Sequence, residues 1–174
     1  AASPEAAAAA AADIAAHCGR VDGLVNVAGG FVWETLEEGD IDTWRRMFRM
    51  NVETAVSATK AFLPHIRKSP AGRIVNIGAA GAVRAAAGMG AYAASKAGVM
   101  RFTESLAEEL KDSSVTVNAI LPSIIDTPAN RESMPDADFG KWVKAEDIAA
   151  TILFLLGDGA KAITGALIPI TGRV

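Results

Sequence analysis

The fold is decided by residues 72–102, which read GRIVNIGAAGAVRAAAGMGAYAASKAGVMRF. The run Arg73–Ile77 is apolar and rich in β-branched residues, which predicts a buried strand. Apolar residues at steps of three and four follow it, at Val99, Phe102, Leu106 and Leu110. This spacing predicts one face of a helix. A strand followed by a helix is the repeating unit of folds built on a parallel sheet.

Three further runs resemble this strand, and helical patterns separate them. The runs are Leu24–Ala28, Val115–Leu121 and Ala166–Ile170. Helices are predicted from Pro4 to near Gly19, behind the cap Ser3, and from Asp147 to Leu156. A longer helix has one apolar face, formed by Trp44, Met47, Phe48, Val52, Ala55, Phe62 and Ile66. Buried strands alternating with helices predict an α/β fold with a doubly wound, Rossmann-like parallel sheet.

Length and composition indicate one domain, residues 1–174. The chain is 51% hydrophobic and 21% charged, which suffices for a single core. The irregular segment at 122–144, with its prolines, is expected to be a loop over a substrate site.

Charge and hydropathy exclude several partners. A net charge of -3 with scattered lysines and arginines argues against nucleic acid. No apolar window reaches the ~18 residues needed to span a bilayer, so no membrane partner is expected. The single cysteine, Cys18, shows no metal-ligand spacing with His17 or His65, which predicts no metal and a reducing, cytoplasmic location.

One tyrosine and one lysine stand four residues apart in the opening stretch, at Tyr92 and Lys96. On a helix this spacing places both side chains on one face. A neighbouring ammonium favours the phenolate and lowers the pKa of a phenol, which is ordinarily about 10. The pair therefore predicts a proton donor that works at neutral pH, and the alternative is a chance spacing on a helix surface.

Asn51 places an amide on the apolar face of the long helix, between Phe48 and Ala55. A buried amide must find hydrogen-bond partners. It is either a satisfied core residue or part of one site with Tyr92 and Lys96, and the presence of that pair favours the second interpretation.

Five motifs in one order resemble the short-chain dehydrogenase/reductase family. They are Asn26–Gly29, Asn51, Arg73–Ile77, Tyr92–Lys96, and Val117–Pro122 followed by Asp126–Pro128. The resemblance runs from about Gly19 to Val174. It implies an oxidoreductase that uses NAD or NADP and acts on a small molecule.

The resemblance also implies the roles of individual residues. Tyr92 would be the acid or base, Lys96 would bind the nicotinamide ribose and lower the tyrosine pKa, and Asn51 would hold a water in a proton relay. Besides Tyr92 and Lys96, the cofactor would be lined by the backbone or hydroxyl of Asn26, Ala28, Gly29, Pro122, Ile125 and Thr127.

Two departures from the family pattern matter. The family's serine, thirteen residues before the tyrosine, is Ala79 here, which offers no donor to the substrate oxygen. Losing one such donor costs about 10²- to 10³-fold in rate. The fingerprint GxGxxG is absent, and no predicted strand flanks Leu24–Ala28 on its far side. We therefore expect the amino-terminal part of the fold to be absent from this chain.

The loop Pro122–Trp142 suggests a narrower resemblance, to dihydropteridine reductases, which also carry alanine in place of the serine. Their quinonoid dihydropteridine substrate takes up a hydride and a proton without forming an alkoxide, so the missing hydroxyl is tolerated. Asn51 is not typical of that branch. A general carbonyl or alcohol oxidoreductase of the same family and a catalytically silent truncated subunit are the alternatives.

The helices that carry Asn51 and Tyr92 hold more apolar residues than one inward stripe needs, among them Val56, Leu63, Val99 and Met100. In the family these helices pair with their symmetry mates. The resemblance therefore implies a homodimer or homotetramer.

Overall fold

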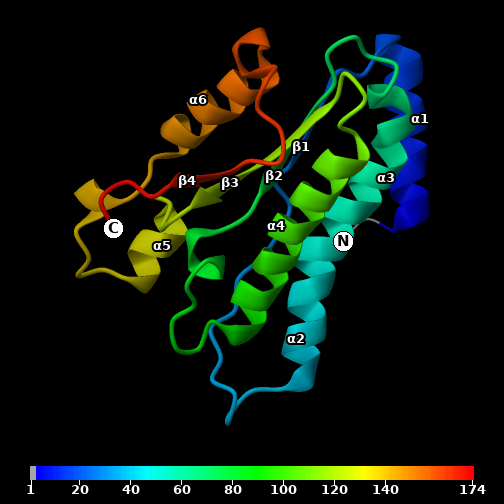
Figure 1. The fold of residues 1–174 in the computed structure, drawn as a ribbon. Coiled ribbons are helices and arrows are strands. Elements are labelled where there is room, and N and C mark those ends of the chain that lie inside the picture. Colours follow the sequence, from blue (N-terminus) through cyan, green and yellow to red (C-terminus); the bar gives the residue numbers. More distant parts are fainter. Residues whose placement is uncertain (1–2) are drawn as a thin grey trace.

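Four parallel strands form one sheet in the part of the chain that the computed structural model describes, residues 3–174 (Figure 1). In order across the sheet they are β1 (Gly23–Asn26), β2 (Arg73–Ile77), β3 (Thr116–Pro122) and β4 (Leu167–Ile170). Every neighbouring pair is parallel. The predicted α/β class and its four strands are confirmed, with boundaries shifted by one or two residues.

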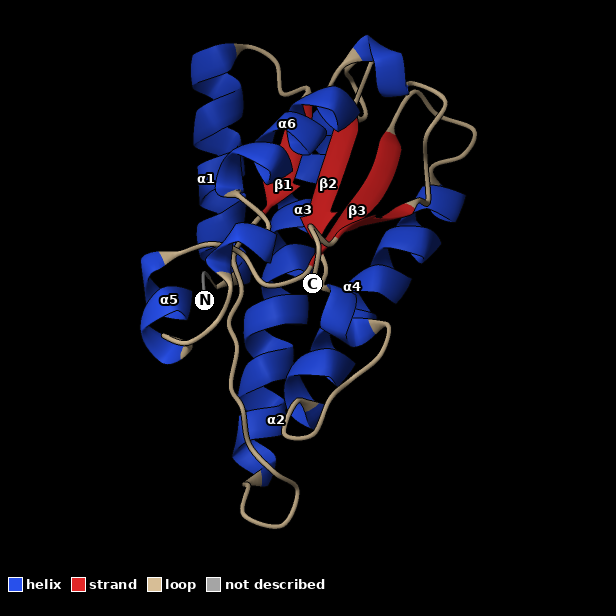
Figure 2. Cartoon of the chain, turned by 90° about the vertical axis from the view of Figure 1, so that its left-hand side faces the viewer, coloured by secondary structure: helices blue, strands red, loops and turns tan. Residues whose placement is uncertain are grey.

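Helices cover both faces of this sheet (Figures 1 and 2). One face is covered by α3 (Thr54–Ile66) and α4 (Gly90–Glu109), with α1 (Pro4–Cys18) packed against α3, and the other by α6 (Ala145–Leu156). The remaining helices are α2 (Ile41–Phe48) and the short α5 (Pro128–Ser133). Successive side chains of a strand point to opposite faces of the sheet. Ile74 of β2 therefore packs with residues of α3 and α4, and Val75 packs with residues of α6.

Helix α1 begins and ends where its sequence predicts. The Ser3 hydroxyl accepts a hydrogen bond from the backbone N–H of Ala6 at 3.2 Å, and Pro4 opens the helix. Gly19 follows the last turn with φ of 73°, a left-handed conformation that glycine adopts without strain.

The long predicted helix is interrupted, and its apolar face is buried only in part. A π-helical turn, Arg49–Glu53, separates α2 from α3. Helix α2 lies beyond the sheet and packs against α4, so Trp44 and Phe48 remain 38% and 50% exposed. The prediction of one continuous buried face was wrong for these two residues, because α2 has no sheet beneath it.

Two of the apolar residues predicted to face a partner subunit are buried within the chain instead. Val99 and Met100 are 2% and 6% exposed, and Met100 packs against Leu121 of β3. Val56 and Leu63 are partly exposed. The difference arises because the sheet and the α2–α3 segment flank α4 on two sides, so α4 needs more than one apolar stripe.

A chain of buried polar side chains crosses the core near the carboxyl ends of β1 and β2. The Asn26 amide donates to Asn76 Oδ1 at 2.8 Å and to the Thr59 hydroxyl at 2.9 Å. The Asn76 amide donates in turn to the Thr103 hydroxyl of α4 at 2.9 Å. These bonds join two strands to two helices, which fixes how far each helix lies along the sheet.

We expect Asn76→Ala to lower the free energy of unfolding by about 2–3 kcal/mol, because Asn26 and Thr103 each lose one hydrogen-bond partner in the core while keeping their bonds to Thr59 and Val99. Chemical denaturation followed by circular dichroism measures this change. Ser105→Ala, an exposed truncation on α4, is the matched control and should shift stability by less than about 0.5 kcal/mol. Equal stability of Asn76→Ala and the parent would contradict the structural role of this chain.

Candidate functional site

The candidate site lies at the carboxyl ends of the strands. The register pairs Asn26 with Asn76, and Ile77 with Ile120, so β1, β2 and β3 end side by side. The segments that follow them, 27–40, 78–89 and 123–144, therefore meet at one end of the sheet. Ligands of open α/β sheets bind in this position.

Tyr92 and Lys96 both face this end of the sheet from the first turns of α4. Lys96 is buried, 6% exposed, and its ammonium donates to the backbone carbonyl of Ile77 at 2.8 Å. The Tyr92 ring meets the Phe31 ring edge to face, with centroids 4.9 Å apart. The four-residue spacing thus brings the phenol and the ammonium to the same part of the molecule, as predicted.

Burial dominates the protonation of both groups. It raises the pKa of Tyr92 above its ordinary value and lowers the pKa of Lys96 to about 8. Lys96 nevertheless stays mostly charged at pH 7. The expected lowering of the Tyr92 pKa by Lys96 is wrong for the protein alone, because desolvation of the phenol outweighs any attraction and the ammonium is bonded to Ile77.

The Asn51 side chain joins the loop after β1 to α4. Its Oδ1 accepts from the Gly30 N–H at 2.9 Å, and its amide donates to the Gly30 carbonyl at 3.1 Å and to the Ser95 hydroxyl at 2.8 Å. Ser95 donates to the Tyr92 carbonyl at 2.7 Å. Both amide hydrogens of Asn51 are used, so its side chain holds the loop and the tyrosine helix together.

The π-helical turn lies at Asn51 itself. Such a turn inserts a residue into the helix, which swings one side chain out of its regular position, and it is frequent at functional sites. Within it, the Thr54 hydroxyl donates to the Met50 carbonyl at 2.6 Å. The sequence identified Asn51 but gave no signal for the π turn.

Gly29 allows the loop backbone to approach both polar groups. A Cβ atom at this position would lie 2.6 Å from Asn51 Oδ1 and 3.2 Å from Lys96 Nζ. Any other residue would therefore displace one of them. Ala28 beside it is exposed, whereas Asn26 directs its side chain into the core network instead.

The third segment carries the remaining predicted cofactor residues, Pro122, Ile125 and Thr127. Pro122 ends β3, the Ile125 carbonyl accepts from the Asn130 amide at 2.7 Å, and the Thr127 hydroxyl caps α5 by accepting from the Asn130 N–H at 3.2 Å. Within residues 3–174, no hydrogen bond joins this segment to Tyr92 or Lys96. These residues lie in the segment that leaves the same end of the sheet, without a direct bond to the polar groups on α4.

The segment 123–144 is less irregular than predicted. It contains α5 and a 3₁₀ turn, Phe139–Lys141. Arg131 of α5 forms two hydrogen bonds to Asp126, at 2.6 and 2.8 Å, and lies over the Phe139 ring at 4.9 Å. This arrangement holds the pKa of the Asp126 carboxyl below its usual range, and it gives the loop a local fold of its own.

Sequence reasoning missed the contacts between the segments after β1 and β2. The Trp33 indole donates to the Ala87 carbonyl at 3.0 Å, and the Glu34 N–H donates to the Gly88 carbonyl at 2.8 Å. Phe31 follows the double glycine Gly29–Gly30 directly, and Trp33 lies two residues further on. This glycine pair was the one feature of the sequence that could have pointed to these contacts.

Ala79 occupies the position of the expected serine, 4% exposed, at the start of the 3₁₀ turn Ala80–Ala82 that packs on α4. Its methyl group offers no hydrogen bond. The side of the site formed by this turn is therefore apolar.

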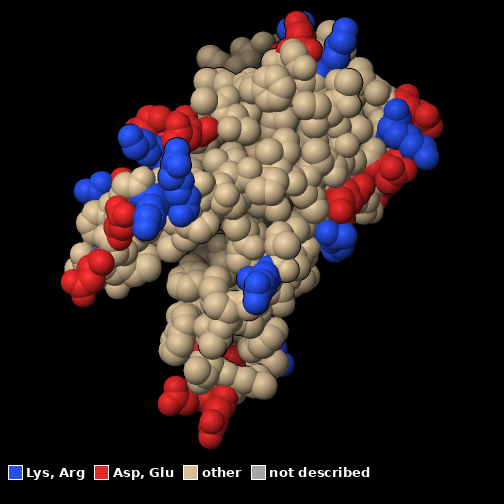
Figure 3. Space-filling model, turned by 60° about the vertical axis from the view of Figure 1, so that its left-hand side comes forward, with Lys and Arg blue, Asp and Glu red and all other residues tan. Residues whose placement is uncertain are grey.

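The described residues set two further limits. They contain no group of three or more His, Cys, Asp or Glu side chains arranged to hold a metal ion. No helix among them combines the length and hydropathy that crossing a bilayer requires. On the face drawn in Figure 3 the lysines and arginines are scattered, and acidic side chains gather at the lower tip.

Comparison with known proteins finds similarity to reductases and dehydrogenases. A family model described as enoyl-(acyl carrier protein) reductase matches residues 1–172. The chain is 36% identical to a 3-oxoacyl-[acyl-carrier-protein] reductase of Pseudomonas aeruginosa, over 90% of this chain and 66% of that protein. It is 30% identical to a D-beta-hydroxybutyrate dehydrogenase of Rhizobium meliloti, over 91% and 69%. The chain thus spans about two thirds of the length of these relatives.

Solved structures of similar proteins share the fold. A short-chain type dehydrogenase/reductase from Mycobacterium ulcerans superposes with a TM-score of 0.92 at 27% identity, over 98% of this chain and 66% of that one. A short chain dehydrogenase from Escherichia coli CFT073, solved in complex with NADPH, gives 0.87 at 30% identity, over 96% and 70%.

The buried Lys96 makes stability depend on pH. Between its folded pKa of about 8 and its ordinary 10.5, the unfolded state binds the proton that the folded state releases, so the free energy of unfolding rises with pH. Relative to Lys96→Met, we expect the parent to gain roughly 1–2 kcal/mol between pH 8 and 9.5, where Tyr92 stays neutral. Denaturant titrations at each pH measure this difference, and parallel curves for parent and variant would contradict it.

Proposed function

Because the chain belongs to the short-chain dehydrogenase/reductase family, we propose that the protein is an NAD(P)-dependent oxidoreductase acting on a small molecule, with Tyr92 as its acid or base. One observation carries the proposal: a phenol and a charged ammonium one helical turn apart, both largely buried where three parallel strands end. Buried titratable groups with shifted pKa values in such a position are typical of catalytic sites.

The residues fit a nicotinamide cofactor. Gly29 keeps space open beside Asn51 and Lys96, which a side chain would fill, and the Lys96 ammonium can exchange the Ile77 carbonyl for ribose hydroxyls. We propose that Gly29, Lys96 and the segment around Thr127 hold the cofactor, which when bound supplies the hydride. Two structural neighbours were solved with NADPH or NADP, which favours NADP over NAD.

Tyr92 performs the proton transfer in this proposal. Its raised pKa keeps the phenol protonated at pH 7, so its hydroxyl can give a proton to the oxygen of a carbonyl substrate. The Lys96 ammonium, still mostly charged at this pH, stabilises the phenolate that remains. Asn51 and Ser95 hold the first turn of α4, and with it the hydroxyl, in a fixed position. A water relay beyond Asn51 would have to use backbone groups of the π turn, since both of its amide hydrogens are engaged.

The substrate is proposed in two versions. The relatives described as 3-oxoacyl-carrier-protein reductase and hydroxybutyrate dehydrogenase favour a carbonyl or alcohol. Ala79 favours a substrate that forms no localised alkoxide, of which quinonoid dihydropteridine is the candidate named from the sequence. The resemblance to dihydropteridine reductases remains a prediction.

We further propose that residues 1–174 act as one domain with 122–144 as the substrate loop, in the cytoplasm. The scattered basic side chains favour a small molecule over a nucleic acid as partner. The exposed Cys18 agrees with a reducing compartment.

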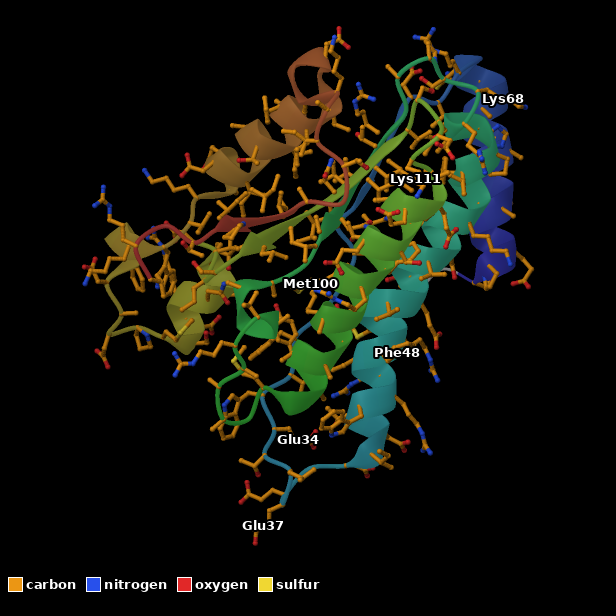
Figure 4. The ribbon with its side chains drawn as sticks, viewed as in Figure 1. Glu34, Glu37, Phe48, Lys68, Met100 and Lys111 are labelled. Atoms are coloured by element: carbon orange, nitrogen blue, oxygen red, sulfur yellow. The ribbon has the colours of Figure 1, made fainter. Side chains whose placement is uncertain are left out.

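A homo-oligomer is proposed from the outer surface of α2 and α3. Ile41 and Phe48 are exposed, and Phe48 projects from the helix in Figure 4. Phe48 also borders a groove of about 620 Å³ that Val52 and Val56 line together with polar residues of α3 and the π-helical turn. Exposed large apolar side chains that gather in this way mark protein interfaces. A second copy is the occupant that family membership favours.

The function is tested by following NADH and NADPH oxidation with a panel of ketones, aldehydes and quinonoid dihydropteridine. We expect Tyr92→Phe, which removes one hydroxyl, to lower kcat by at least about 10²-fold while the melting temperature is unchanged. Retention of activity within a few-fold would disprove the role of Tyr92.

Ala79→Ser in the same assay separates the substrate classes. A restored donor should raise kcat/KM on simple ketones about tenfold or more and leave pteridine reduction unaltered. A parent inert toward quinonoid dihydropteridine would remove the pteridine version, and a parent inert toward every substrate would favour the silent-subunit alternative.

The oligomer is tested with Phe48→Asp, which we expect to give a monomer by light scattering, because a carboxylate cannot be buried there without a partner. Phe154→Asp is the matched control, since Phe154 is also 50% exposed and lies on α6, on the opposite face of the sheet. A parent that is already monomeric at micromolar concentration would count against the proposal.

A further inference from the structure

Two aromatic rings border the candidate site and have no role in the mechanism above. Phe31 and Trp33 are 55% and 59% exposed, which is high for such large apolar groups. We call Phe31 and Trp33 the aromatic shelf.

The shelf is held in place rather than loose. The Trp33 indole is bonded to Ala87, and its ring lies directly over Gly88, where a Cβ atom would overlap it. Gly88 has φ of 75°. Glycine is therefore required here for two reasons, its left-handed backbone and the lack of a side chain under the Trp33 ring. Fixed, exposed apolar groups are preorganised to bind an apolar ligand.

Phe31 connects the shelf to the acid. Its ring meets Tyr92 at an interplanar angle of 80°, so the two rings are nearly perpendicular. Phe31 is also 55% exposed, so part of its ring remains open to a third ring beside Tyr92. A flat substrate that stacks on this exposed part of Phe31 lies next to the acid.

The turn that follows β2 lacks a second donor. Ala79 and the turn Ala80–Ala82 carry no side chain that could donate a hydrogen bond to a substrate oxygen. A conjugated substrate spreads that charge over its ring, which reduces its dependence on a second hydrogen bond. The same features that make this turn poor for simple ketones therefore suit a conjugated one.

The rim of the shelf is acidic. Glu34, Glu37 and Glu38 follow Trp33 in the loop, and Figure 4 shows Glu34 and Glu37 at the end of the molecule beyond α2. Carboxylates in the loop that carries the shelf repel anionic ligands. The rim thus disfavours an anionic substrate.

We propose that the substrate is a neutral, planar, conjugated carbonyl compound whose ring lies on Phe31 while its oxygen faces Tyr92. This inference rests on the proposed oxidoreductase function and names the substrate class of that site. In the reduction, a hydride from the cofactor joins the carbonyl carbon and the Tyr92 proton joins the oxygen. Phe31 determines specificity, and Tyr92 remains the catalytic residue.

The test compares two dicarbonyl probes that differ in ring area, 9,10-phenanthrenequinone and 2,3-butanedione. The parent should prefer the quinone in kcat/KM. Phe31→Ala should reduce kcat/KM for the quinone by roughly ten- to a hundredfold, the value of a lost ring contact, and change that for butanedione less than about threefold. Phe31→Tyr, which keeps an aromatic ring at this position, should retain the quinone activity of the parent.

Leu36→Ala is the control, since Leu36 is 84% exposed on the same loop. It should leave both probes unaffected. Phe31→Leu, which keeps an apolar group without a ring face, replaces Phe31→Ala if that variant melts at a lower temperature than the parent. An equal loss on both probes would overturn the proposal, because Phe31 would then act through Tyr92 alone.

Direct binding separates this proposal from the proposed function. If the parent reduces neither probe, the oxidoreductase assignment fails, and calorimetric titration with 9,10-phenanthrenequinone still tests the shelf. Binding that weakens about tenfold in Phe31→Ala supports it. Absence of binding, or binding unchanged in Phe31→Ala, overturns it.

Discussion

The amide of Asn51 is the constraint on which the candidate site depends. One side chain satisfies both backbone groups of Gly30 and reaches Ser95, which is bonded to the Tyr92 carbonyl. A buried amide without these partners would cost more than its bonds contribute, so the arrangement tolerates little displacement. The position of the Tyr92 helix relative to the loop after β1 follows from it.

Around this clamp the molecule buries two groups that water would otherwise solvate. Tyr92 and Lys96 both resist ionisation as a result of burial, and Lys96 relies on a single carbonyl, that of Ile77. Such an arrangement reduces stability in exchange for reactivity, which is typical of a functional site. The core network of Asn26 and Asn76 stabilises the fold instead, since each of those amides is hydrogen-bonded.

Much of the fold was predictable because its signals are local. The β-branched runs identified the strands, and the Ser3 cap and Gly19 marked the ends of α1. Asn51, Tyr92 and Lys96 could be named because each is conspicuous in an apolar or alanine-rich context. The sequence also indicated a long helix with an apolar face from Trp44 to Ile66, but no local pattern indicated the π turn within it, which carries Asn51 and its bonds to Gly30 and Ser95.

Other features were missed for the same physical reason. The bond from Trp33 to Ala87 joins residues 54 positions apart, and nothing near either residue predicts the other. Val99 and Met100 were expected at a subunit surface because the helix has more apolar residues than one buried face needs. The sequence pattern does not show how many neighbouring elements pack against that helix. Desolvation of Tyr92 likewise depends on burial, which spacing alone does not give.

The segments on the two sides of the site differ in how firmly they are bonded to the rest of the molecule. The segments after β1 and β2 are tied to each other through Trp33 and Glu34, and to α4 through Asn51. The segment 123–144 is organised by the Asp126–Arg131 pair, half of it exposed to water, and by backbone bonds to Val143. Local opening of such a segment costs far less than global unfolding. We therefore expect ligands to exchange on the α5 side while Tyr92 and the residues that hold it stay in place, so that exchange rates and proton transfer depend on different parts of the molecule.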